Sequence, residues 1–280
     1  MIGLRSITLG FRSKTLFRRQ VGLSRGLREE QLREKLLKNQ RDSRYLTKDS
    51  DERKVIEEVF DGATIRALNS LLHRREIDYL NGVVAAGKEA RVYWGVTPDG
   101  SPRAVKIYLM ASAEFKKRLR YIAGDRRFGK IPSSSREIIK LWVQKEYKNL
   151  QTAASGGVRV PLPYAFNENV LIMEYIGEPP APAPIFAETE VDEADYRWTM
   201  KMVKNLYRKT GLVHADLSEY NIFKTGKKER VLFDMGSAVL TTHPESREML
   251  LRDVTNMVRF FRKRGIHSRD PDEIVEEIVS

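Results

Sequence analysis

Apolar residues recur along the chain at the spacings of short helices and strands. Apolar residues spaced three and four positions apart predict helices over 53–60, 64–73, 135–153, 192–210, 244–264 and 271–279. Extended segments are expected over 83–106, as a hairpin that turns at Thr97-Pro98-Asp99-Gly100, and over the continuous apolar run 170–175. These elements determine where the polar residues with candidate chemistry fall.

One stretch near the C-terminus combines an acid, a carboxamide and a second acid. Asp216 and Asn221 lie five residues apart, and Asp234 ends a short apolar run. In Mg-dependent phosphoryl transfer, one carboxylate accepts or orients the proton of the attacking hydroxyl. The amide and the other carboxylate then supply oxygen ligands for Mg²⁺. The alternative for an isolated pattern of this kind is a polar loop beside a buried strand.

A lysine and a glutamate fall where the apolar pattern predicts burial. Lys106 lies in the middle of the strand 103–108, and Glu146 lies on the apolar stripe of the helix 135–153. An unpaired carboxylate on that stripe is costly, so a Lys106–Glu146 pair is expected, with Lys106 held over phosphates. The alternative is a glutamate at the edge of the stripe.

Two further segments have weaker nucleotide-binding signals. Gly82 and Gly87 lie beside Lys88, where glycine permits close approach to phosphate oxygens. A plain strand–turn–strand is the favoured explanation of this pattern when it is taken alone. The strand 170–175 runs into a Pro-rich stretch over 179–184, which is typical of a lobe boundary with backbone groups available to an adenine. The alternative there is a simple linker.

Composition narrows the class of protein. The chain has 280 residues, no cysteine, four histidines and a net charge of +12. The absence of cysteine and the few histidines argue against a disulfide framework and a zinc site and fit a cytoplasmic protein. The positive charge favours a polyanionic partner such as RNA, and the alternative is a generally basic, solvated surface. The sequence contains no apolar run long enough for a transmembrane helix.

Basic residues gather in two segments. Residues 1–28 contain seven arginines and lysines and no acid, which fits a basic arm on RNA, a transit-like segment or a plain tail. Residues 111–132 form a second basic segment, expected to be a loop near the cleft that contacts RNA or nucleotide, or a solvated loop.

The motifs also occur in the order of a known family. The segments concerned are Gly87-Lys88-Glu89-Ala90-x-Val92-Tyr93, Arg120-Tyr121-Ile122-x-Gly124-Asp125-x-Arg127-Phe128, Trp142-x-x-Lys145-Glu146, His214-Ala215-Asp216-Leu217-Ser218-Glu219-Tyr220-Asn221-Ile222, Asp234-Met235-Gly236, Leu251-Arg252-Asp253 and Phe260-Phe261. Together they resemble the protein-kinase fold and, most closely, the type-one subgroup of the RIO family of atypical serine/threonine kinases, in its archaeal branch. The resemblance covers about residues 53–265.

The resemblance implies an α+β, two-lobed, protein-kinase-like fold that is truncated and lacks peptide-binding subdomains. It implies a flexible basic arm over 1–50, N-terminal helices and a β-sheet nucleotide-binding lobe over 51–176, and a small, mostly helical lobe with the catalytic and metal-binding loops over 177–280.

The resemblance also assigns roles to individual residues. Asp216 would be the catalytic acceptor, Asn221 and Asp234 the metal ligands, and Asp234 also the candidate aspartyl-phosphate. The residues implied in binding ATP, with Mg²⁺ or alternatively Mn²⁺, are Ala86, Gly87, Lys88, Glu89, Val92, Lys106 and Glu146, with backbone groups of Glu174 and Ile176 at the adenine.

The sequence departs from the family at Ala85-Ala86, where Ser-Thr is usual, so two hydroxyls near the nucleotide are missing. Few residues follow Asp234, which leaves no room for an activation segment and favours action on a docked macromolecule or on the chain itself.

The expected function is therefore that of an ATP-dependent serine/threonine kinase and ATPase in maturation of the small ribosomal subunit. The alternative is a catalytically weak, RNA-binding assembly factor that uses ATP as a conformational ligand. A small-molecule phosphotransferase is disfavoured, because no large insertion follows Asn221 to build a substrate pocket.

Overall fold

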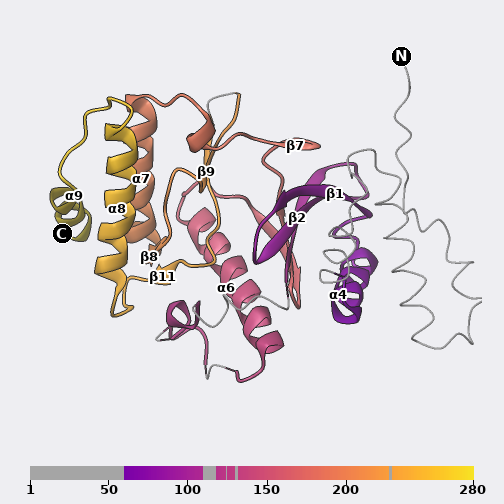
Figure 1. The fold of residues 1–280 in the computed structure, drawn as a ribbon. Helices are drawn as coiled ribbons and strands as arrows, with labels where there is room; N and C mark the ends of the chain where they lie inside the picture. The colour runs from indigo at the N-terminus through magenta and orange to yellow at the C-terminus, as the bar shows by residue number, and fades with distance from the viewer. Residues whose placement is uncertain (1–59, 110–117, 124, 130–131, 227–228) are drawn as a thin grey trace, which may run out of the picture. The chain divides into compact units, whose positions relative to one another are not determined.

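The computed structural model describes residues 60–109, 118–123, 125–129, 132–226 and 229–280. Packing divides them into two units (Figure 1). The first unit holds 60–109 and Tyr164–Met173, and the second holds the described residues from 118 to 163 with Glu174–Ser280. The predicted arm over 1–50 and the predicted helix over 53–60, apart from Phe60, lie outside the described residues.

The first unit is built on one five-stranded sheet. Its strands are β1 (Tyr79–Ala86), β2 (Ala90–Val96), β3 (Pro102–Tyr108), β4 (Pro163–Asn167) and β5 (Val170–Glu174), in the order β1-β2-β3-β5-β4. The predicted turn between β2 and β3 is confirmed, with the N–H of Gly100 donating to the carbonyl of Thr97 at 2.9 Å. β1 begins earlier than predicted, at Tyr79, and its pairing with β2 is irregular between Leu80 and Val83.

One helix packs on this sheet. α4 (Gly62–His73) begins at Asp61, whose side chain accepts the N–H of Thr64 at 2.8 Å, a standard N-terminal cap. The apolar side chains that it shares with the sheet in one core are Ile65, Leu68, Leu71, Val105, Ile107, Val170 and Ile172. The alternation in β3 therefore turns Val105 and Ile107 into this core and leaves Lys106 on the other face of the sheet.

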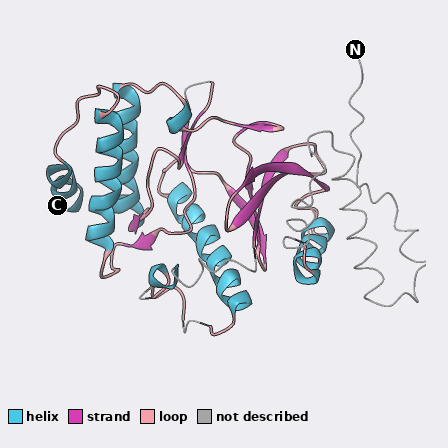
Figure 2. Ribbon diagram, viewed as in Figure 1, coloured by secondary structure: helices cyan, strands magenta, loops and turns pink. Residues whose placement is uncertain are grey.

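Helices predominate in the second unit (Figure 2). They are α6 (Ser135–Ser155), α7 (Glu193–Thr210), α8 (Ser246–Arg262) and α9 (Pro271–Val279), with the 3₁₀ turns η1 (Leu119–Tyr121) and η2 (Phe186–Glu188). The helix predicted over 192–210 is confirmed as α7: Asp192 caps it, and Gly211 ends it with a positive φ of 67°. None of the described helices is long and apolar enough to cross a membrane.

Three pairs of short strands complete the second unit. β6 (Gly177–Glu178) pairs with β7 (Ala181–Pro182), β8 (Leu212–Val213) with β11 (Val239–Leu240), and β9 (Ile222–Lys224) with β10 (Arg230–Leu232). One loop connects β8 to β9 and contains Asp216 and Asn221, and another connects β10 to β11 and contains Asp234. Because the strands at both ends of these loops pair with each other, the two loops lie side by side.

The observed units differ from the predicted lobes. The predicted boundary at 176 assigned 174–176 and the described residues from 118 to 163 to the first lobe, whereas packing groups them, including α6, with the second unit. The reason is a set of buried hydrogen bonds from α6 to residues 235–238.

A buried aspartate ties α7 to the β9–β10 hairpin. The Asp195 side chain is fully buried, and its two oxygens bind Lys224 and Arg230, which remain 17% exposed. Asp195 also accepts the backbone N–H of Asp192 at 2.9 Å, in a capping box at the start of α7. One carboxylate thus neutralises two cations on the hairpin that leads to both loops.

We expect Asp195→Asn to lower the free energy of unfolding by about 3 kcal/mol, because both cations lose their counter-charge. This is the low end for a broken buried ion pair, since the cations keep some solvent. Urea unfolding followed by circular dichroism measures the change. Glu193→Gln, in an exposed pair with Arg197 on the same helix, is the matched control and should change stability by less than about 0.5 kcal/mol. Equal effects of the two substitutions would contradict this account of Asp195.

Candidate active site

Asp216 projects from the loop after β8. Its neighbours Ala215 and Leu217 are buried at 0% and 1% exposure, whereas Asp216 itself is exposed. Ala215 has a positive φ of 67°, a conformation that residues other than glycine rarely adopt. The strained turn directs the carboxylate of Asp216 out of the core while the flanking residues anchor the loop.

The backbone around Asp216 is held by α8. The carboxylate of Asp253, only 1% exposed, accepts the N–H of Ala215 at 2.7 Å and that of Leu217 at 2.9 Å. Arg252 donates to the carbonyl of Ala215. Two neighbouring residues of α8 therefore bind the backbone N–H groups on both sides of Asp216 and the carbonyl that precedes it.

Sequence reasoning assigned no role to Asp253. The signal was present, because Asp253 lies among the apolar positions of an amphipathic helix, as Glu146 does in α6. A buried carboxylate requires hydrogen-bond donors, and the N–H groups of a sharply turned loop supply them.

Asn221 and Asp234 lie at the same end of the β9–β10 hairpin. Asn221 directly precedes β9, and the N–H of Phe233 donates to its carbonyl at 2.9 Å. The Asn221 amide nitrogen donates to the backbone carbonyl of Asp216 at 2.7 Å. Because a carbonyl can only accept, this contact fixes the amide orientation and leaves the side-chain oxygen of Asn221 for another ligand.

A histidine links the two loops. The Nε2 atom of His214 lies 3.0 Å from the carbonyl of Phe233, the residue before Asp234, and donates to it. Asp234 itself has a positive φ of 60°. The structure thus brings together the three residues that the sequence predicted for catalysis and metal binding.

The two carboxylates affect each other. Desolvation by the surrounding chain raises the pKa of Asp216 above its ordinary value, His214 opposes this shift, and the negative charge of Asp234 adds to it. A raised pKa makes Asp216 a stronger base when it is deprotonated. A cation between the two carboxylates would relieve their repulsion.

The nucleotide residues predicted in the first unit lie on adjacent strands. Ala86 ends β1, Gly87, Lys88 and Glu89 form the following turn, and Val92 lies opposite Lys106 in the β2–β3 pair. Lys106 Nζ lies 5.0 Å from the centre of the Tyr108 ring. These residues are therefore assembled at one end of the sheet.

The remaining predicted residues belong to the second unit. Glu146 is 1% exposed in α6, which confirms its predicted burial. Its pairing with Lys106 stays a prediction, since the two residues belong to different units. The N–H of Glu174 donates to Leu162, and the carbonyl of Ile176 accepts from Ala183, both at 2.8 Å, so these two groups are committed within the chain.

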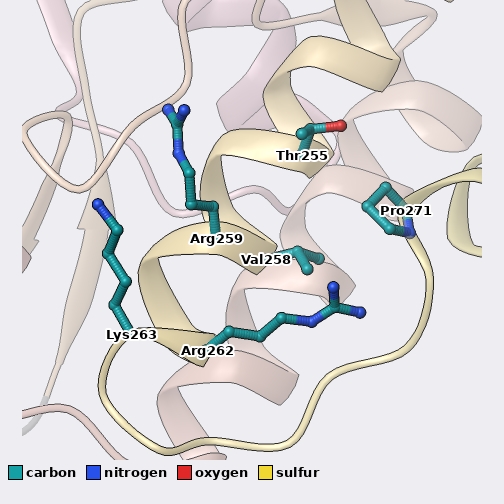
Figure 3. Close-up of a pocket in the computed structure, with 6 residues that line it drawn as sticks. All are labelled: Thr255, Val258, Arg259, Arg262, Lys263 and Pro271. Carbon is teal, nitrogen blue, oxygen red and sulfur yellow. The ribbon is translucent and has the colours of Figure 1, made fainter.

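A cavity of about 370 Å³ lies apart from these residues, on α8. Its lining residues are Thr255, Val258, Arg259, Arg262, Lys263 and Pro271 (Figure 3). Arg262 extends toward Pro271 and donates to the carbonyls of Ser268 and Arg269, so it fastens the loop before α9. None of the lining residues is a predicted site residue.

Comparison with known proteins identifies the family. A family model described as RIO domain matches residues 91–274. The RIO-type serine/threonine-protein kinase Rio1 of Haloferax volcanii is 38% identical over 238 residues, which cover 84% of this chain and 81% of that protein. The chain belongs to the RIO1-type family of serine/threonine kinases. The predicted type-one resemblance, including its archaeal branch, is confirmed.

A second archaeal RIO relative and a solved structure extend the comparison. The Rio1 kinase of Methanocaldococcus jannaschii is 38% identical over 217 residues, covering 76% of this chain and 73% of that protein. The Rio2 kinase of Chaetomium thermophilum, solved as an ADP/Mg²⁺-phosphoaspartate complex, matches with a TM-score of 0.60 at 18% identity. That match covers 77% of this chain and 66% of the Rio2 chain.

These comparisons confirm the predicted fold class, a kinase-like α+β fold with an N-terminal antiparallel sheet. Membership in the RIO kinase family also implies ATP and Mg²⁺ as cofactors. The RIO domain includes α8 and therefore the carboxylate of Asp253 that holds the candidate catalytic loop.

Asp253 predicts a specific pH dependence of stability. Burial raises the pKa of Asp253 from 3.8 to about 6. The folded state then binds more protons than the unfolded state between about pH 4 and 6, so this group's contribution to stability falls as pH rises through that window. The measured quantity is the difference between the unfolding free energies of wild type and Asp253→Asn. We expect this difference to fall by up to about 3 kcal/mol as the pH rises from about 4 to 6, at about 1.4 kcal/mol per pKa unit.

Urea unfolding of both proteins at a series of pH values measures this difference. Glu248→Gln removes an exposed carboxyl from the same helix and is the control. A difference between wild type and Asp253→Asn that stays flat or rises from pH 4 to 6 would show that the Asp253 pKa is not raised.

Proposed function

We propose that the chain transfers the γ-phosphate of ATP with Mg²⁺ and acts in maturation of the small ribosomal subunit. The observation that supports this most is the hydrogen bonding within and between the two loops. Asn221 binds the backbone of Asp216 within the first loop, and His214 binds the residue before Asp234 in the second. A base and two oxygen ligands held together are what phosphoryl transfer requires.

Each residue has a distinct role in this proposal. Asp216 orients the attacking hydroxyl and accepts its proton, a role that its raised pKa favours. The side-chain oxygen of Asn221 and the carboxylate of Asp234 are the metal ligands. The positions of Ala215 and Leu217, fixed by Asp253, keep Asp216 from moving during the reaction.

The donor set fits Mg²⁺. Asn221 and Asp234 supply hard oxygen atoms, which are the ligands that Mg²⁺ prefers in proteins. Mg²⁺ commonly takes only one or two protein ligands and completes its shell with phosphates and water. When bound, it neutralises charge on the phosphates; Mn²⁺ prefers similar ligands and is the expected substitute.

The nucleotide would lie against the residues at the end of the sheet. Lys106 would bind the phosphates and pair with Glu146, and the turn at Ala86, Gly87, Lys88 and Glu89 would cover them beside Val92. Backbone groups of Glu174 and Ile176 that are not committed within the chain would hold the adenine.

ATP hydrolysis is part of the proposal. The Rio2 relative was solved with a phosphoaspartate, and Asp234 is the corresponding candidate here. Its carboxylate would take the γ-phosphoryl group as ADP leaves, and water would then release phosphate from the aspartyl-phosphate.

The proposed partner is the pre-ribosomal small subunit, through its RNA or proteins. Net charge of +12 favours a polyanion. Arg259 and Lys263 extend from one side of α8 and add cationic surface within the described residues. Phosphodiester groups are the chemistry that such surfaces bind.

We expect Asp216→Ala to lower ATP turnover in the presence of pre-ribosomal particles by about 100-fold or more, the usual contribution of a positioned general base. Asp234→Ala should abolish Mg-dependent turnover, because it removes the charged metal ligand. Steady-state phosphate release measures both. Glu193→Ala, an exposed acid on α7, is the control and should retain wild-type turnover.

The outcomes separate two functions. Equal turnover by wild type and Asp216→Ala would refute phosphoryl transfer at this site and favour the catalytically weak assembly factor that uses ATP as a conformational ligand. Unchanged turnover by Asp234→Ala would refute the proposed metal ligand.

A further prediction concerns RNA. We expect deletion of residues 1–45 to weaken RNA binding and to reduce the steepness of its salt dependence, because each neutralised phosphate adds roughly 0.7–0.9 to the slope. Fluorescence anisotropy with a pre-ribosomal RNA fragment across a salt series measures the slope. The double variant Arg259→Ala/Lys263→Ala tests the α8 surface in the same way. A slope unchanged by the deletion would exclude the arm as the RNA contact.

A further inference from the structure

One face of α6 carries two buried polar residues that bind the loop after Asp234. Lys145 and Asn149 are both 0% exposed, one helical turn apart. The Lys145 amine donates to the carbonyls of Gly236, at 2.8 Å, and of Ala238. The Asn149 amide donates to the carbonyls of Met235 and Ala238, at 2.8 and 2.9 Å.

Trp142 extends the same face by one turn and leaves no space for a larger residue in the loop. A Cβ atom on Gly236 would lie 2.9–3.1 Å from the fully buried indole ring of Trp142. Contacts this short would require the ring or the loop to shift. The backbone of the loop is thus in direct van der Waals contact with α6 as well as hydrogen-bonded to it.

These contacts act on a strained turn. Asp234 has a positive φ of 60°, and such a conformation in a residue other than glycine persists when the surrounding structure fixes it. The N–H of Ala238 donates back to Met235 at 3.2 Å, which closes the turn. Three of the carbonyls that follow Asp234 are bound by α6, so the direction of its carboxylate depends on that helix.

Burying the polar side chains of Lys145 and Asn149 carries a free-energy cost. Burial, followed by the nearby charge of Arg127, lowers the pKa of Lys145 to about 7, which means that the folded protein penalises its charged form. The Asn149 side-chain oxygen is buried without a hydrogen-bond partner. A backbone carbonyl cannot be replaced, so the loop needs these buried donors to keep its path, and the two side chains serve the loop rather than the apolar core.

We infer that Lys145 and Asn149 are positioning residues for the metal site, which hold the turn 234–238 so that the Asp234 carboxylate faces the metal. The inference rests on the proposed role of Asp234 as a metal ligand. Outer-shell contacts of this kind usually change metal affinity by about 10–100-fold when removed.

The test is Lys145→Met, which keeps a side chain of similar length and removes the donors. Binding of Mn²⁺ in the presence of ADP is measured by the electron paramagnetic resonance signal of unbound Mn²⁺, at a temperature where thermal unfolding shows each variant folded. We expect the Mn²⁺ dissociation constant to rise about 10–100-fold. Lys140→Met makes the same change on the exposed side of α6 and should leave it unchanged.

Two further variants keep the outcomes separate. Asn149→Ser removes both amide contacts in a smaller change, gives the same expected weakening, and decides the matter if Lys145→Met does not fold. Asp234→Ala tests the metal site itself. If Asp234→Ala loses Mn²⁺ affinity while folded Lys145→Met or Asn149→Ser stays within twofold of wild type, the positioning role is overturned and the proposed site stands. If Asp234→Ala binds Mn²⁺ as wild type does, both fail.

Discussion

The carboxylate of Asp253 determines how the candidate catalytic loop can be built. Its two oxygens accept the N–H groups on both sides of Asp216, at 2.7 and 2.9 Å. Both N–H groups belong to buried residues, which would otherwise lack acceptors in a loop that pairs with no strand at that point. A carboxylate supplies two acceptors in one plane, so it can hold a sharp turn from both sides. The position of the exposed Asp216 is therefore fixed through its neighbours Ala215 and Leu217, whose backbone Asp253 binds.

The second loop then depends on the first. His214 and Asn221, in the first loop, both form hydrogen bonds with the backbone of Phe233 in the second loop. α6 binds the following part of the second loop, which His214 and Asn221 do not contact. The two positive φ values at Ala215 and Asp234 lie inside this set of contacts. One strained residue precedes the candidate base Asp216 and the other is the candidate metal ligand Asp234, and such strain is typical of a site whose geometry is set before ligand binds.

Much of this could be predicted from sequence, because local patterns report which positions are buried. The helix predicted over 192–210 matches α7, and the apolar stripe of α6 identified Glu146 as a buried acid. The same patterns could not identify the hydrogen-bond partners of the buried polar side chains. Lys145 binds carbonyls 91 and 93 residues away, and backbone acceptors have no side-chain signature in a sequence. The placement of α6 with the second unit follows from those bonds, so the lobe boundary expected at 176 could not anticipate it.

The glycine turn of the first unit shows where the family pattern and this chain diverge. Ala85-Ala86 removes two hydroxyls that the resemblance places near the nucleotide. In addition, the N–H of Gly87 donates to the carbonyl of Ala90 at 3.0 Å, and Arg91 donates to the carbonyl of Gly87. The turn therefore satisfies its own backbone groups, and a phosphate contact from the Gly87 amide would require it to open. Under the proposed function, the positive charges of Lys88 and Lys106 would then have to supply more of the phosphate binding than the backbone amides of this turn.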